Sequence, residues 1–177
     1  MMRVEVSQRD FEKIKKNIFQ LDGEQIGYRL KCAAERAAQS GVTAGVRRMC
    51  QVYNINRKEA KSRIDIKIRG SQETLIDIRG PSEHIESFSR TKWRKKGVFV
   101  SIKKGGGALI PRSFKHGDTP LMREGAARYP IRGIYGPSVP QMFAEESVIE
   151  AATEATMETY KKRVIHELKR GTGGRQS

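Results

Sequence analysis

The stretch Ile131-Arg-Gly-Ile-Tyr-Gly-Pro-Ser-Val-Pro-Gln-Met-Phe143 marks the point where an irregular segment becomes the last helix of the chain. Gly136-Pro137 is typical of a turn, and Ser138 belongs to the residue types preferred at a helix N-cap. Gln141 follows three residues later and completes a capping box, while Pro140 falls in the first helical turn, where its missing N–H costs nothing. The stretch therefore predicts a helix that begins directly after Ser138.

The residues that follow predict one long helix over 139–170. Apolar side chains recur at helical spacing from Phe143 to Leu168. Glutamates come early in this segment and lysines and arginines come late, which is the order that the helix dipole favours. Gly171 ends the helix, and the polar residues 171–177 are predicted to form a disordered tail.

Two further helices are predicted within residues 7–53. The first covers residues 7–20, and the second runs from about residue 22 to residue 53 with small residues such as Gly41 and Gly45 along it. Small residues let another backbone approach closely, so we expect this helix at the centre of a packing layer. Cys32 and Cys50 are separated by about 27 Å along it, which is too far for a disulfide between them.

Between these helices the pattern changes to that of strands. Residues 64–69 alternate isoleucine with charged residues, 75–79 and 98–102 read as further strands, and 85–88 as a weaker one. Residues 56–63 predict a short basic helix, and residues 105–137 an irregular arm with one or two short strands. The predicted fold class is α+β. It has two N-terminal helices, the second long, a small mostly antiparallel sheet over 64–102, the arm, and the C-terminal helix, all in one domain over residues 1–170.

The charge balance indicates a partner. The chain has 35 lysines and arginines against 20 acidic residues, a net charge of +15, whereas solubility asks for only about 2–8 on a small domain. A nucleic acid is the first partner that such an excess suggests, and an acidic protein surface the second. No long apolar run predicts a signal peptide or a membrane span, so we expect a protein made and kept in a cytoplasm.

Positive charge gathers around the only tryptophan, Trp93. Cations interleaved with an aromatic residue are typical of nucleic-acid contact. An equally weighted interpretation is a solvated hairpin loop with Trp93 in a subunit contact. The candidate residues for a nucleic acid or an acidic partner are Arg90, Lys92, Trp93, Arg94, Lys95, Lys96, Lys103 and Lys104.

No residue set predicts catalysis. His84, His116 and His166 stand in unrelated contexts, none with a nucleophile at a recognisable spacing. The run from Lys103 to Gly107 fails the phosphate-loop pattern because its lysines precede its glycines, although a backbone anion nest stays open as an alternative. We expect no enzyme activity, cofactor, metal site or small-molecule substrate.

Several segments resemble the phage minor tail protein Z family. The run from Tyr135 to Phe143 is similar to a run that this family carries before its last helix. The segment from Val98 to Gly107 resembles the family's strand and Lys-Lys-Gly loop, and 111–114 resembles its Pro-x-x-Phe step. Tyr129-Pro130-Ile131 matches its short apolar stretch. The resemblance covers about residues 98–170, whereas residues 70–93 contain no stretch that is similar to the family.

The resemblance implies a structural virion protein at the head-proximal end of a phage tail, acting in tail completion and head–tail joining. It implies a ring of copies, with six suggested by other tail rings. Its other partners would be tail-tube, tail-terminator or head–tail connector proteins. Contact with the genomic DNA that passes through the joint is left as an alternative. The expected location is the virion tail, and the host cytoplasm during assembly.

The arm is expected to reach a neighbouring copy. The intersubunit contacts would be Phe114, Tyr135, Gly136, Pro137, Met142 and Phe143. Tyr135→Ala, or deletion of residues 105–128, would then leave a soluble helical protein that no longer completes tails. The alternative function is a free-standing basic nucleic-acid-binding protein.

Overall fold

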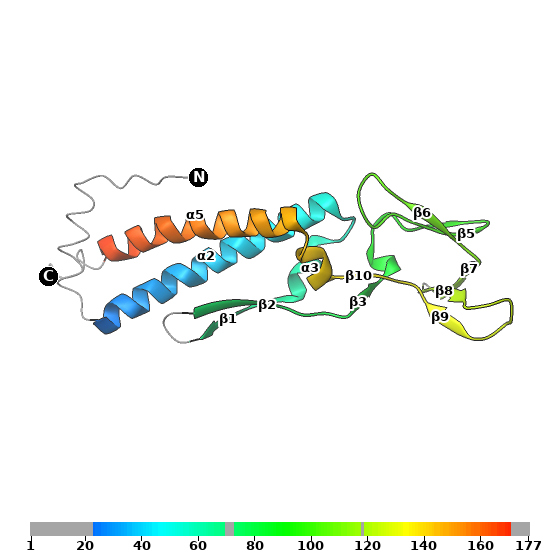
Figure 1. Ribbon diagram of the computed structural model, residues 1–177, viewed down its shortest axis with the longest axis horizontal. Helices are drawn as coiled ribbons and strands as arrows, with labels where there is room; N and C mark the ends of the chain where they lie inside the picture. Colours follow the sequence, from blue (N-terminus) through cyan, green and yellow to red (C-terminus); the bar gives the residue numbers. More distant parts are fainter. Residues whose placement is uncertain (1–22, 70–72, 118, 171–177) are drawn as a thin grey trace. The chain divides into compact units, whose positions relative to one another are not determined.

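The computed structural model describes residues 23–69, 73–117 and 119–170 of the chain (Figure 1). The fold is mixed helix and strand, and the α+β prediction is confirmed, with a long helix, small antiparallel sheets and a C-terminal helix. The elements in chain order are α2 (Gly23–Val52), α3 (Arg57–Ser62), β1 (Ile64–Arg69), β2 (Glu73–Ile78), β3 (Ser82–His84), the 3-10 helix η1 (Ile85–Ser87), β4 (Lys92–Arg94), β5 (Gly97–Val100), β6 (Ala108–Pro111), β7 (Ser113–His116), β8 (Thr119–Arg123), β9 (Ile131–Gly133), β10 (Tyr135–Ser138), α4 (Val139–Phe143) and α5 (Glu146–Arg170).

The described chain divides into two compact units. Unit 1 comprises residues 23–41, 66–69, 73–76 and 153–170, and unit 2 comprises 42–65, 77–117 and 119–152. The helices α2 and α5 each continue from one unit into the other. The division reflects the density of contacts, and the single domain over residues 1–170 stays a prediction.

Unit 1 is built on an antiparallel pair of helices, the first part of α2 and the last part of α5 (Figure 1). Arg29 donates to the main-chain oxygen of Glu167 at 3.0 Å, and the hydroxyls of Thr159 and Ser40 meet at 2.9 Å. Ala33 and Ala37 are buried on α2. Because alanine side chains are short, the two helices can approach closely, as the small residues of this segment predict.

Unit 2 contains a core to which helices and strands both contribute. The fully buried side chains include Val46, Met49, Phe88, Val98, Val139, Met142 and Val148. The ring of Phe143 lies over Gly45 of α2, where a built Cβ would come within 2.5 Å of it. This close approach explains why a glycine interrupts the second half of α2.

Two three-stranded antiparallel sheets form the β-rich part of unit 2 (Figure 1). The first has the order β4-β5-β6, with Trp93 opposite Val98 and Phe99 opposite Leu109. The second has the order β7-β8-β9, with Phe114 opposite Leu121. Strands β3 and β10 pair separately, and β1 pairs with β2.

The helix start predicted at Ser138 is confirmed. The Ser138 hydroxyl accepts from the Gln141 N–H, and the Gln141 side chain accepts from the Ser138 N–H, which together make the capping box. Asn56 caps α3, and its side chain accepts from the N–H of Lys58. Both cysteines are free, as their spacing on α2 requires.

Three expectations about elements need correction, and two fall outside the described residues. The last helix is divided at Ala144 and Glu145 into α4 and α5, and residues 85–87 form a 3-10 helix where a strand was expected. The arm over residues 105–137 contains strands β6 to β9, paired with one another or with β5, and most of β10, which pairs with β3. The helix expected over residues 7–20 and the tail 171–177 lie outside the described residues.

Candidate functional site

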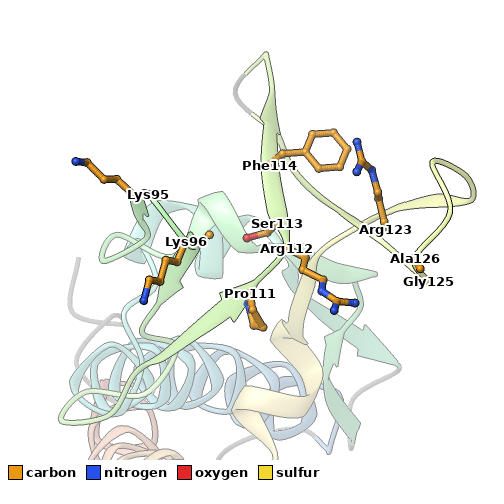
Figure 2. A pocket seen from close by; sticks show the side chains of 10 residues that line it. Lys95, Lys96, Pro111, Arg112, Ser113, Phe114, Arg123, Gly125 and Ala126 are labelled. Carbon is orange, nitrogen blue, oxygen red and sulfur yellow. The ribbon is translucent and has the colours of Figure 1, made fainter.

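Unit 2 contains a pocket of about 700 Å³ between the turns of its two three-stranded sheets. We name it the basic pocket, because four of its ten lining residues are lysine or arginine and none is acidic (Figure 2). Its lining residues are Lys95, Lys96, Gly97, Pro111, Arg112, Ser113, Phe114, Arg123, Gly125 and Ala126.

Strand pairing brings these residues together. The β4–β5 hairpin sets Arg94 opposite Gly97, so Lys95 and Lys96 form its turn. Pairing of β5 with β6 sets Gly97 opposite Pro111. The φ of Gly97 is +141°, and a Cβ at this position would collide with the main-chain oxygen of Ile110. Only glycine fits here, and the pocket wall depends on it.

Ser113 stabilises the pocket wall at the turn between β6 and β7. Its hydroxyl accepts from the N–H of Val98 and donates to the main-chain oxygen of Ile110, both at 2.7 Å. The preceding residue, Arg112, has a φ of +60°, in the left-handed region that non-glycine residues seldom occupy. The Ser113 hydrogen bonds hold this turn, and Arg112 is exposed at the pocket.

The cations of the pocket lack carboxylate partners among the described residues. The guanidinium of Arg123 lies 5.6 Å from the centroid of the Phe114 ring, and Figure 2 shows the two side chains next to each other. No ion pair to a described carboxylate is formed by Lys95, Lys96 or Arg112. Like charges gathered at one place repel one another, so an anionic occupant would be stabilised here.

The eight cations and aromatics predicted from sequence are only partly brought together. Lys95 and Lys96 line the basic pocket. On β4, Lys92 and Trp93 are exposed, and the guanidinium of Arg94 lies 5.4 Å from the ring centroid of Phe99. Arg90 is exposed in the turn before β4.

Lys103 and Lys104 lie apart from the pocket lining. The Lys103 ammonium contacts the Glu145 carboxylate at 3.0 Å and stands 5.3 Å from the Tyr53 ring centroid. The Lys104 N–H donates to the main-chain oxygen of Val52. Lys103 therefore serves a contact within unit 2.

The Tyr53 hydroxyl donates to the same Glu145 carboxylate at 2.5 Å. These hydrogen bonds from Tyr53 and Lys103 hold the pKa of Glu145 below its ordinary value. Burial, followed by the contact with Glu145, raises the pKa of Tyr53. Hydrogen bonding to Glu145 likewise raises the pKa of Lys103. The three groups form a cluster, named here the Glu145 cluster, at the junction of α4 and α5.

The residues expected at an intersubunit contact have different environments. Phe114 lines the basic pocket, and Tyr135 is 55% exposed, with its ring centroid 4.7 Å from that of His84. The backbone of Gly136 supports the Phe88 ring, since a built Cβ would come within 2.5 Å of it, and Pro137 is half-buried. Met142 and Phe143 are buried by the chain itself, so we remove them from the proposed contact surface.

Sequence reasoning missed Arg112 and Arg123, the cations that complete the pocket. They stand 16 and 27 residues after Lys96 and join it only through the β5–β6 and β7–β8 pairings. The left-handed turn at Arg112 has no sequence signal, because arginine is not a residue type that favours this conformation.

Residues 23–69, 73–117 and 119–170 contain no group of three or more histidine, cysteine or acidic side chains placed to hold a metal ion. Within the same ranges, no helix combines the length and apolar character needed to cross a lipid bilayer. No family model, curated protein or solved structure matches the chain.

Proposed function

We propose that this protein is a non-enzymatic structural subunit of a phage tail, which acts at tail completion and head–tail joining as a ring of copies. The sequence resemblance over about residues 98–170 is the starting point. Part of the resembling run has a clear role within the fold, since Gly136 admits the Phe88 ring and Ser138 caps α4. Tyr135 in the same run is exposed and available to a neighbour.

The structural observation that carries the proposal is the open edge formed by β6. This strand ends the β4-β5-β6 sheet in the described chain, its four residues Ala108–Pro111 are uncharged, and Leu109 is 39% exposed. Edge strands of soluble monomers are usually protected by charges or coverage, because an open edge pairs with other chains. An open, uncharged edge therefore favours extension of the sheet by a partner.

The test is the composition of the phage particle. Mass spectrometry of purified particles should find the protein, and electron microscopy of particles made without it should show tails that are not joined to heads. Leu109→Lys places a charge on the β6 edge and should deplete the protein from particles. Ala127→Lys makes the same charge change in an exposed loop and should not. Particles that lack the protein, from a host that produces it normally, would overturn the proposal.

The basic pocket favours a second candidate, the free-standing nucleic-acid-binding protein. Four cations without an acidic neighbour in the lining could neutralise phosphates. This candidate predicts tight, strongly salt-dependent binding by the isolated protein, and no requirement for the protein in joined tails.

A further inference from the structure

The basic pocket needs an anionic occupant whose shape suits a compact depression. Its cations gather at the turns of β4–β5 and β6–β7 and at the end of β8. Lys103, another cation that the sequence singled out, lies outside the pocket lining and is engaged by Glu145. A nucleic-acid backbone is best followed by a continuous groove of cations with open aromatic faces, and here one face of Phe114 already lies against Arg123.

A surface of opposite charge lies on α5. Glu146, Glu150 and Glu154 are exposed and spaced four residues apart, so they form a row with about 6 Å of rise between neighbours. Ile149 and Met157 stand on the same side of the helix and are 47% and 53% exposed. We name these five residues the acidic face. Glu158, the next in the row, is paired with Lys162 at 2.6 Å and is not included.

The two surfaces match in charge and in apolar content. The three carboxylates of the acidic face form no ion pair with a described cation, and three pocket cations form none with a described carboxylate. Beside its cations the pocket presents Pro111, Phe114 and Ala126, which can cover the exposed apolar side chains of α5.

We propose that the basic pocket of one copy receives the acidic face of α5 from a second copy. This inference rests on the proposed self-assembling function and names its contact. Because the pocket and the helix face are different surfaces, the contact is head-to-tail, and repeated head-to-tail contacts close into a ring when the rotation between copies allows it. The occupant is thus a second copy of this chain, selected by charge complementarity.

The test exchanges the charges of the two surfaces. The pocket variant carries Lys96→Glu and Arg112→Glu, both at exposed turn positions, and the face variant carries Glu146→Lys and Glu150→Lys. Sedimentation over a concentration series should show that each variant alone associates at least about tenfold more weakly than the natural protein, since like charges now meet. An equimolar mixture of the two variants should regain association, because each can then meet an opposite charge on the other.

Recovery in the mixture also shows that both variants are folded. A chain carrying all four substitutions keeps the natural net charge and should associate like the natural protein. Arg47→Glu with Lys58→Glu is the matched control, since it makes the pocket variant's charge change at exposed positions outside it, and it should leave association unchanged.

Three outcomes would overturn the inference. They are a natural protein that stays monomeric throughout the concentration series, variants that associate normally, and a mixture that fails to recover. If the pocket variant instead loses affinity for a DNA oligonucleotide while self-association is unaffected, the pocket belongs to a nucleic acid. The composition of the phage particle decides the proposed function separately, so assembly through β6 alone would reject this contact and keep the function.

Discussion

Glu145 is an acidic residue whose ionisation is coupled to the fold through two contacts. It accepts from the Tyr53 hydroxyl and contacts the Lys103 ammonium, and it lies at the break between α4 and α5. The folded state lowers its pKa, so it contributes stability above the ordinary pKa of a glutamate, about 4.3, and that stability is lost as the pH falls through the folded value. The pKa values of Tyr53 and Lys103 are raised and act at alkaline pH, where stability is lost as the pH rises through them.

Glu145→Gln should therefore lower stability at pH 7 and have a smaller effect in acid. The amide still accepts from Tyr53 but cannot pair its charge with Lys103. Urea unfolding at pH 7 and over a series down to about pH 2 would measure the difference in midpoint between variant and natural protein, which should shrink as the pH falls below the lowered pKa of Glu145. Glu86→Gln is the control, because Glu86 is an exposed glutamate outside the Glu145 cluster. A difference that stays constant over the whole pH series would contradict the assignment.

Among the secondary-structure elements, the structure differs most from the sequence prediction in the arm over residues 105–137. Strand β6 pairs with β5 over four residues, Ser113 holds the N–H of Val98, and Pro120 of β8 is buried. Residues 105–128 are therefore part of the folded body of unit 2. Their deletion would leave one edge of β5 unpaired and remove the partner of β9.

We now expect the 105–128 deletion to unfold the β-rich part of unit 2, in contrast to the expectation from sequence. Tyr135→Ala removes a side chain that is 55% exposed and should leave the fold intact while depleting the protein from particles. Circular dichroism and limited proteolysis would compare the two. A deletion variant as resistant to protease as Tyr135→Ala would show that the strands of the arm are dispensable to the fold.

At the scale of the whole molecule, the net charge of +15 acts independently of any one site. A surplus of this size attracts DNA non-specifically at low salt, and the attraction weakens as salt rises. Binding of the isolated protein to DNA at low salt is thus expected from the net charge alone and does not identify the pocket's occupant.

The salt dependence of DNA binding distinguishes attraction by the general net charge from binding in the basic pocket. Neutralising Lys95, Lys96 and Arg112 should reduce the salt slope of DNA binding by about as much as neutralising Arg47, Lys58 and Lys61, because on our proposal all six contribute only to the general charge. Electrophoretic mobility shifts over a salt series would measure both slopes. A clearly greater reduction from the pocket substitutions would favour the nucleic-acid-binding candidate.

Features that depend on local chemistry can be predicted from the amino-acid sequence. The capping box at Ser138 and Gln141, the long helix α2 and the strands β1, β2 and β5 were predicted, because caps and hydrophobic periodicity act within a few residues. The same holds for Lys95 and Lys96, which are neighbours in the chain and share one turn of the pocket.

Contacts between residues that are distant in the chain depend on how the whole molecule packs. The division of the last helix at Glu145 coincides with contacts from Tyr53 and Lys103, 92 and 42 residues away. The pocket requires Arg112 and Arg123, which reach Lys96 through strand registers. Met142 and Phe143 are buried because α4 packs into unit 2 with the Phe143 ring against Gly45. Pairing and packing between remote segments depend on the whole chain, so no local pattern could have predicted these three outcomes.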